Sequence, residues 1–119
     1  MYSYNSLEEE INEVKNRIKR KYKKEIHVNY KLVADPLWRY VSFSEAEREI
    51  RINVIPIEGF ARNLDESKRC IKAFYLVEYM RLLGFEDEDI VKFVREEYME
   101  LVPYVSKVVR ITSAKTIWI

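Results

Sequence analysis

Apolar residues recur every three or four positions near the N-terminus of the chain. The recurring positions are Leu7, Ile11, Val14, Ile18 and Tyr22. Their spacing predicts a helix of about five turns that buries a single stripe. Just before this run, residues 6–9 read Ser-Leu-Glu-Glu. This pattern predicts a capping box, in which the Ser6 and Glu9 side chains bond the backbone at the start of the helix.

The pattern then changes to a period of two. In residues 26–32 apolar Ile, Val, Tyr and Leu alternate with His, Asn and Lys. This alternation predicts a half-buried strand, which Asp35-Pro36 ends. Residues 38–44 and 49–55 predict two further strands, with a polar hairpin connection between them. A proline and a glycine that follow, at positions 56 and 59, are expected to close the sheet region.

A long apolar helix is predicted next. Asn63 or Asp65 is its expected N-cap, and Gly84 is the expected C′ residue after Leu83. In residues 70–83 the charged side chains are Lys72, Glu78 and Arg81. The rest of that helix is apolar or aromatic, which predicts cover on several sides.

A further helix is expected to begin in residues 86–89 and to run to about Leu101. Its inward positions are predicted to be Ile90, Val91, Val94, Tyr98 and Leu101. Pro103 either ends it or begins another short helix, and residues 110–119 are expected to form a last strand or a docking arm. The element order predicts one α+β domain over residues 1–119. We expect a small, mainly antiparallel sheet of three or four strands, packed against the N-terminal helix and two later helices.

The composition adds limits on function. Hydrophobic residues make up 48% of the chain and charged residues 34%, which is typical of a folded soluble protein. Abundant Tyr, Lys, Glu and Ile are common in thermophile proteins. The net charge of +1 favours neither nucleic acid nor a membrane. No apolar run is long enough to cross a bilayer, and the acidic N-terminus differs from a signal peptide, so a cytoplasmic location is expected.

Metal and nucleophile chemistry is restricted by the scarcity of two residue types. His27 is the single histidine and Cys70 the single cysteine, so neither an intramolecular disulfide nor a zinc site of imidazoles and thiolates can form. We expect no metal and no cofactor. His27 is predicted to be a solvated strand residue rather than a catalytic base, and Cys70 an inert core thiol.

A charge pair stands out in the apolar helix. Residues 77–85 read Val-Glu-Tyr-Met-Arg-Leu-Leu-Gly-Phe. The simpler interpretation is a helical pair, because Glu78 and Arg81 are three residues apart. The other interpretation starts from the element order: a helix, three strands of which the last reads Ile-Arg-Ile-Asn, this apolar helix, and a helix with two adjacent glutamates.

This order resembles the zincin metallopeptidases, in particular the minimal single-domain gluzincins of archaea, over roughly residues 7–101. The resemblance places Val77 and Arg81 where the family motif His-Glu-x-x-His has its two histidines. It places Glu78 at the general base, and Glu96 or Glu97 at the third zinc ligand. It also implies that the Ile-Arg-Ile-Asn strand lies along the cleft.

The two missing histidines exclude the family's chemistry. Valine has no lone pair for zinc, and arginine brings a fixed positive charge to the place of the cation. If the scaffold is zincin-like, Arg81 is expected to replace the metal's charge and to pair with Glu78 and with Glu96 or Glu97. We therefore expect a pseudoenzyme without peptidase activity. Its expected role is that of a binding module for an unidentified protein partner or for a second copy of itself.

The alternative is a small nucleic-acid-binding protein that uses a basic helix. The candidate phosphate contacts are Lys15, Arg17, Lys19, Arg20, Lys21, Lys23 and Lys24. Candidate stacking rings are Tyr22, Tyr30, Trp38 and Tyr40. A solvated helix surface explains the same basic run, and no Gly-rich phosphate loop or RNA-binding motif accompanies it.

Overall fold

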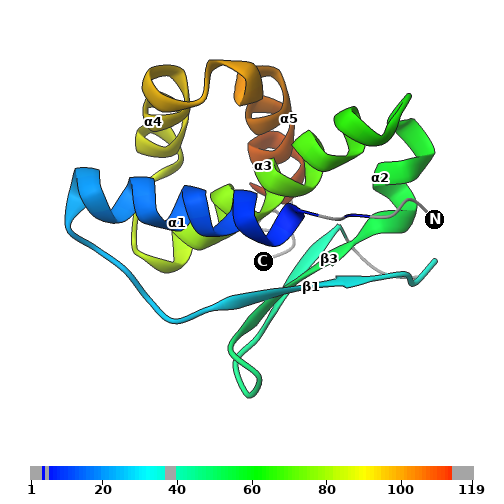
Figure 1. Cartoon of the computed structure of the whole chain (residues 1–119), viewed down its shortest axis with the longest axis horizontal. Helices are drawn as coiled ribbons and strands as arrows, with labels where there is room; N and C mark the ends of the chain where they lie inside the picture. The colour runs from blue at the N-terminus through cyan, green and yellow to red at the C-terminus, as the bar shows by residue number, and fades with distance from the viewer. Residues whose placement is uncertain (1–3, 5, 37–39, 114–119) are drawn as a thin grey trace.

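Helices form one layer and a small sheet the other (Figure 1). The computed structural model describes residue 4, residues 6–36 and residues 40–113. Its helices are α1 (Leu7–Tyr22), α2 (Val54–Phe60), α3 (Leu64–Leu82), α4 (Asp87–Glu97) and α5 (Val102–Ser113), with a 3-10 turn, η1 (Met99–Leu101), before α5. Its strands are β1 (Asn29–Val33), β2 (Val41–Ser44) and β3 (Glu49–Asn53). The predicted α+β class is confirmed.

The sheet has the strand order β1-β3-β2. The predicted hairpin is confirmed, since β2 and β3 pair antiparallel, but β1 pairs with β3 in parallel. The sheet is therefore mixed rather than mainly antiparallel, and the described residues contain no fourth strand. The third strand also ends earlier than predicted. Val54 and Ile55 form the first turn of α2, because the Asn53 side chain caps that helix.

The start of α1 corrects one prediction. Ser6 adopts a left-handed backbone conformation, with φ of 69°, and its side chain makes no capping bond. An N-cap normally has an extended conformation, so the predicted capping box with Glu9 is wrong. The Ser6 hydroxyl instead accepts a hydrogen bond from Lys68 Nζ of α3, at 3.3 Å. The predicted stripe is present, and Leu7, Ile11, Val14 and Ile18 are buried.

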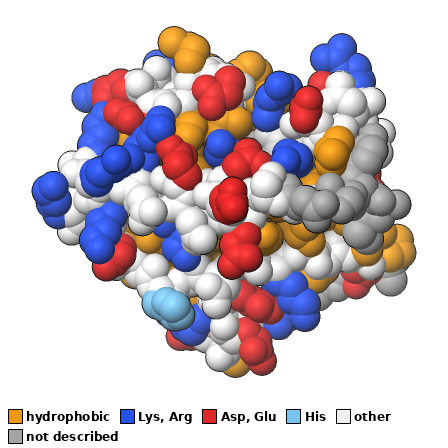
Figure 2. Space-filling model, in the orientation of Figure 1, with side chains coloured by type: hydrophobic (Ala, Val, Ile, Leu, Met, Phe, Trp, Pro, Cys, Tyr) orange, Lys and Arg blue, Asp and Glu red, His pale blue; other side chains and the backbone are white. Residues whose placement is uncertain are grey.

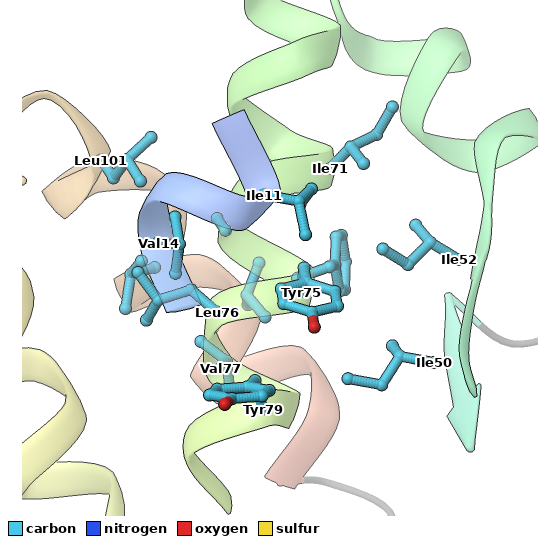
Figure 3. Packing of buried hydrophobic residues seen from close by; sticks show 14 of the residues in the cluster. Ile11, Val14, Ile50, Ile52, Ile71, Tyr75, Leu76, Val77, Tyr79 and Leu101 are labelled. Carbon is cyan, nitrogen blue, oxygen red and sulfur yellow. The ribbon is translucent and has the colours of Figure 1, made fainter. Parts of the chain in front are cut away.

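Helix α3 is the centre of the core. Asn63 is its N-cap, and the Asn63 Oδ1 atom accepts from the backbone N–H of Glu66 at 2.9 Å. At the other end Gly84 has a φ of +95°, which suits the predicted C′ glycine. In Figure 3, side chains of α1 and of β3 point toward α3 from two directions. This two-sided cover explains why nearly the whole circumference of α3 is apolar.

The C-terminal third is helical rather than extended. The predicted helix ends at Glu97, and Leu101 belongs to η1. Pro103 lies in the first turn of α5, which continues to Ser113 and so includes the start of the predicted last strand. The rest of that tail, residues 114–119, lies outside the described residues, as do residues 38 and 39 of the predicted second strand. The inward positions Ile90, Val94, Tyr98 and Leu101 are buried, while Val91 is partly buried.

Candidate functional site

The guanidinium of Arg81 joins three helices. Its Nε and Nη2 atoms donate to Oδ1 and Oδ2 of Asp87, in the first turn of α4, at 2.9 and 3.1 Å. Its Nη1 atom donates to Glu78 Oε1 at 3.4 Å and also to the hydroxyl of Thr112 on α5. Thr112 in turn donates to the backbone carbonyl of Val108 at 2.8 Å. We call Glu78, Arg81, Asp87 and Thr112 the Arg81 cluster.

The Arg81 cluster is buried on its Glu78 and Thr112 side, whereas the Asp87 side chain is 41% exposed. Glu78 is 8% exposed, and the Arg81 side chain 19%. Burial alone would lower the pKa of Arg81, but the hydrogen bonds and charges of Asp87 and Glu78 outweigh it and hold that pKa above its usual value. The cation is therefore permanently charged, and four of its five N–H groups donate to Asp87, Glu78 and Thr112. A protonated guanidinium has no lone pair to offer, so Arg81 cannot act as a metal ligand.

Val77 contributes nothing to this cluster. It is completely buried in the hydrophobic core and brings no donor atom. Of the two positions that the resemblance matches to the motif's histidines, one is thus an aliphatic core side chain and the other a paired arginine. The predicted Glu78–Arg81 pair is confirmed by the 3.4 Å contact.

Glu96 and Glu97 do not join Arg81, contrary to the expectation from the resemblance. Both glutamates, at the end of α4, face α1. Lys21 bonds to Glu96, and its Nζ atom lies 3.5 Å from Glu97 Oε2. Arg17 Nη1 donates to the Glu97 backbone carbonyl at 2.7 Å. Asp87, which the sequence analysis did not single out, takes the place expected for Glu96 or Glu97.

The Ile-Arg-Ile-Asn strand belongs to β3, at the centre of the sheet, so neither of its edges is free. Its last residue, Asn53, is 1% exposed and serves the fold. Asn53 Oδ1 accepts from the backbone N–H groups of Ile55 and Asp35, at 3.2 and 3.3 Å. Asn53 Nδ2 donates to the Asp35 carbonyl at 2.6 Å. The side chain fixes the turn that follows β1 to the start of α2.

Three residues of the basic run, Arg17, Lys19 and Lys21, pair with acids. Besides the bonds of Arg17 and Lys21, Lys19 lies 3.2 Å from Glu25, and Arg17 also pairs with Glu13. Figure 2 shows acidic and basic side chains interspersed over this face.

The remaining candidates of this run make local contacts. Lys15 Nζ and Lys23 Nζ donate to backbone carbonyls, of Val28 and Arg20 respectively, and Lys24 lies over the ring of Phe85. Arg20 is exposed. The face is therefore electrically mixed rather than uniformly positive.

The candidate stacking rings pack on the protein itself. The ring centroids of Tyr22 and Phe85 lie 4.7 Å apart, and those of the stacked rings of Tyr40 and Phe74 lie 5.4 Å apart. The ring of Tyr30 meets that of Tyr75 edge-on. Trp38 lies outside the described residues. These rings help to close the core, which reduces the area open to a nucleobase.

His27 and Cys70 have the predicted exposure and burial. His27 is exposed as predicted, but it lies before β1, which begins at Asn29 rather than at residue 26. Cys70 is buried in α3, and burial raises the pKa of its thiol to about 11. A thiol that stays protonated at neutral pH is a poor nucleophile, which agrees with an inert core cysteine.

A groove between α1 and β1 is the feature that sequence reasoning missed. Its volume is about 420 Å³, and it is lined by Glu8, Ile11, Asn12 and Lys15 of α1, Asn29 and Tyr30 of β1, and Glu49 of β3. Figure 1 shows α1 above β1, on the same side of the molecule. Local alternation predicts a strand but does not tell which strand lies at the edge. Because β3 lies between β1 and β2, β1 is an edge strand, and the groove lies beside it.

Comparisons with protein-family models, curated proteins and solved structures gave no match to this chain. The described residues hold no group of three or more His, Cys, Asp and Glu side chains placed to share a metal ion. None of the helices in the described part of the chain has the length and apolar character needed to cross a membrane.

Proposed function

We propose that this chain is a non-catalytic binding module that takes an extended segment of a partner protein along the free edge of β1. A zincin-like scaffold without its metal site is part of this proposal. The buried Val77 and the paired Arg81 support the absence of a metal site, because they leave no ligand set for zinc at the position of the motif.

The observation that carries the proposal is the free edge of β1. The backbone N–H of Asn29 donates to the Arg48 carbonyl, just before β3. This bond shows that the backbone N–H of Asn29 points toward β3. In a parallel pair, alternate residues bond to the neighbouring strand. Asn29, Lys31 and Val33 thus face β3, while the N–H and C=O groups of Tyr30 and Leu32 face the other way. Within the described residues, no strand pairs with that side.

The groove supplies the space beside this edge. At one end the edge is closed, because the Val28 carbonyl accepts from Lys15 Nζ at 3.1 Å and from the Tyr75 hydroxyl at 2.9 Å. Beyond Val28 the groove runs between α1 and β1, with Ile11 and Tyr30 among its lining residues. An extended segment bound here would form main-chain bonds with Tyr30 and Leu32 and place alternate side chains in the groove.

The test is selection of a random library of linear heptapeptides on the immobilised chain, followed by binding measurements on edge variants. Leu32→Pro removes an N–H that faces away from β3, so the sheet keeps its own bonds. Phe43→Pro is the matched control, because the antiparallel register with β3 makes the Phe43 N–H face outward from β2 at the opposite edge. Circular dichroism checks that both variants are folded.

We expect Leu32→Pro to weaken binding of the selected peptides more than about tenfold, and Phe43→Pro to leave it within about twofold, since one edge loses a main-chain bond and the other is not used. In the unmodified chain, bound peptide should slow hydrogen exchange at Tyr30 and Leu32. If no peptide is selected, or if both variants bind equally well, the proposal is wrong.

The nucleic-acid alternative is tested in the same preparation. A gel shift at two salt concentrations would weaken steeply with salt if the basic residues of α1 contacted phosphates. The pairing of Lys19, Lys21 and Arg17 with acids leads us to expect no such shift.

A further inference from the structure

We infer that the partner segment carries an acidic residue at the position beside Lys31. This inference rests on the proposed function, since it concerns the segment that would add to β1. Its basis is a row of side chains that crosses the sheet. In this row Ser42 of β2 is in register with Arg51 of β3, and Arg51 with Lys31 of β1. A segment added to β1 extends the row by one residue.

At the β1 end of this row the positive charge of Lys31 has no acidic partner among the described residues. Arg51 Nε lies 2.9 Å from Glu49 Oε1, so the charge of Arg51 is matched within its own strand. Lys31 is exposed and forms no ion pair with the described residues. Like charges directly opposite each other on neighbouring strands repel. An acidic side chain on the far side of Lys31 would be attracted by Lys31.

Strand alternation fixes which residue of the segment this is. Ile50 and Ile52 point into the core, so Arg51 and its register partner Lys31 lie on the outer face of the sheet. The segment residue beside Lys31 therefore points outward too, while the residues before and after it point toward the groove. The expected recognition pattern is an acid flanked by two side chains that meet Ile11 and Tyr30.

A second copy of the chain is a poorer occupant. Antiparallel pairing of two β1 strands over their full length, Asn29–Val33, would place Lys31 opposite Lys31. An exposed lysine in the middle of an edge strand is a common way to discourage self-association. The exposed Lys31 thus favours a partner segment with an acidic residue over a second copy of the chain.

The experiment repeats the heptapeptide selection on Lys31→Glu and, as a control, on Arg20→Glu. Arg20 is an exposed residue of α1 that forms no ion pair with the described residues. We expect acids to be enriched at the central position on the unmodified chain and on Arg20→Glu, and bases on Lys31→Glu. A selected peptide with its acid changed to lysine should bind the unmodified chain about fivefold more weakly and Lys31→Glu about fivefold more tightly.

The two proposals fail in different ways. Peptides that are sensitive to Leu32→Pro but bind Lys31→Glu as well as the unmodified chain would overturn the acidic preference and leave the edge site standing. Peptides insensitive to Leu32→Pro would overturn the edge site and the acidic preference with it. A stable dimer of the unmodified chain that Leu32→Pro disrupts would contradict the partner of opposite charge, because β1 would then pair with itself despite the repulsion between the two Lys31 side chains.

Discussion

Arg81 and Asp87 meet through two parallel hydrogen bonds, of 2.9 and 3.1 Å, between the last turn of α3 and the first turn of α4. The tight connection at Gly84 makes this geometry available, since only six positions separate the two residues. The carboxylate also lies at the N-terminus of α4, where the helix dipole favours negative charge. This short stretch of chain thus fixes α4 relative to α3. The bond from Arg81 to Thr112 connects α5 to the same cluster.

Replacing Arg81 with methionine should destabilise the chain by about 3 kcal/mol, the lower end of the range for a broken buried ion pair, because Glu78 would be left buried without its cation. Urea unfolding followed by circular dichroism measures the change. Adding Glu78→Gln to this variant should recover part of the loss, since the buried charge is removed. Lys21→Ala, at an exposed pair, is the control and should change the midpoint far less. An Arg81→Met variant as stable as the parent would show that the cluster is dispensable.

Asn53→Ala should cost more stability than Asn63→Ala, although both residues are N-caps. Asn63 is exposed, and its loss should cost about 1 kcal/mol. Asn53 is buried and also bonds the backbone of Asp35, so its loss should cost about 2 to 3 kcal/mol because two further polar groups lose a partner. Thermal or urea unfolding of the two variants side by side makes the comparison. Equal losses would mean that water replaces the Asn53 side chain.

Zinc should not stabilise the chain. Ligand binding to the folded state raises the unfolding midpoint, so a titration with zinc during thermal unfolding reports any specific site. Neither Val77 nor the paired Arg81 offers a ligand, and we expect an unchanged midpoint and no stoichiometric zinc by elemental analysis. A stoichiometric metal content together with peptide hydrolysis would refute the non-catalytic proposal.

Stability should fall in alkaline solution. Burial raises the pKa of the Cys70 thiol to about 11, from its usual value of 9.0, which applies in the unfolded chain. Between these values the unfolded state loses its proton first, so the free energy of unfolding decreases as pH rises, by up to about 1.4 kcal/mol per pH unit. Burial also raises the pKa of Tyr75 and Tyr98, which adds to the decrease at higher pH.

Cys70→Ala isolates the thiol in this prediction. Urea midpoints measured from about pH 7 to about pH 10 should decline less steeply in Cys70→Ala than in the unmodified chain, because one titrating group has been removed. Identical slopes would place the thiol in a more hydrated environment than its burial indicates.

Local signals in the sequence predicted the helices well. The stripe of α1, the Asn63 cap and the glycine after α3 each depend on residues a few positions apart, and all three are present. The errors at helix starts have a local cause as well. Asn53 can continue a strand or cap a helix, and the apolar residues after it fit both. In the structure the Asn53 side chain caps α2.

Relationships between distant elements were harder to predict. The resemblance led us to expect Glu96 or Glu97 beside Arg81. Helix α4 begins next to Arg81, however, and its last turn lies about 15 Å further along the helix axis. The opposite end of α4 therefore meets α1. Similarly, the alternation in β1 predicts a strand but contains no information about its partner, so the free edge and its groove followed only from the structure.

The central place of β3 has a consequence for folding. The hairpin of β2 and β3 closes a turn of residues 45–48, whereas β1 can join only after β3 has formed, across a much longer loop. Closing the longer loop costs more conformational entropy, so we expect β1 to add last during folding and to open first in the native state. Hydrogen exchange should then be faster at the β3-facing amides Lys31 and Val33 than at the hairpin amides. The strand that would receive a partner segment is thus the part of the sheet that such a segment would stabilise most.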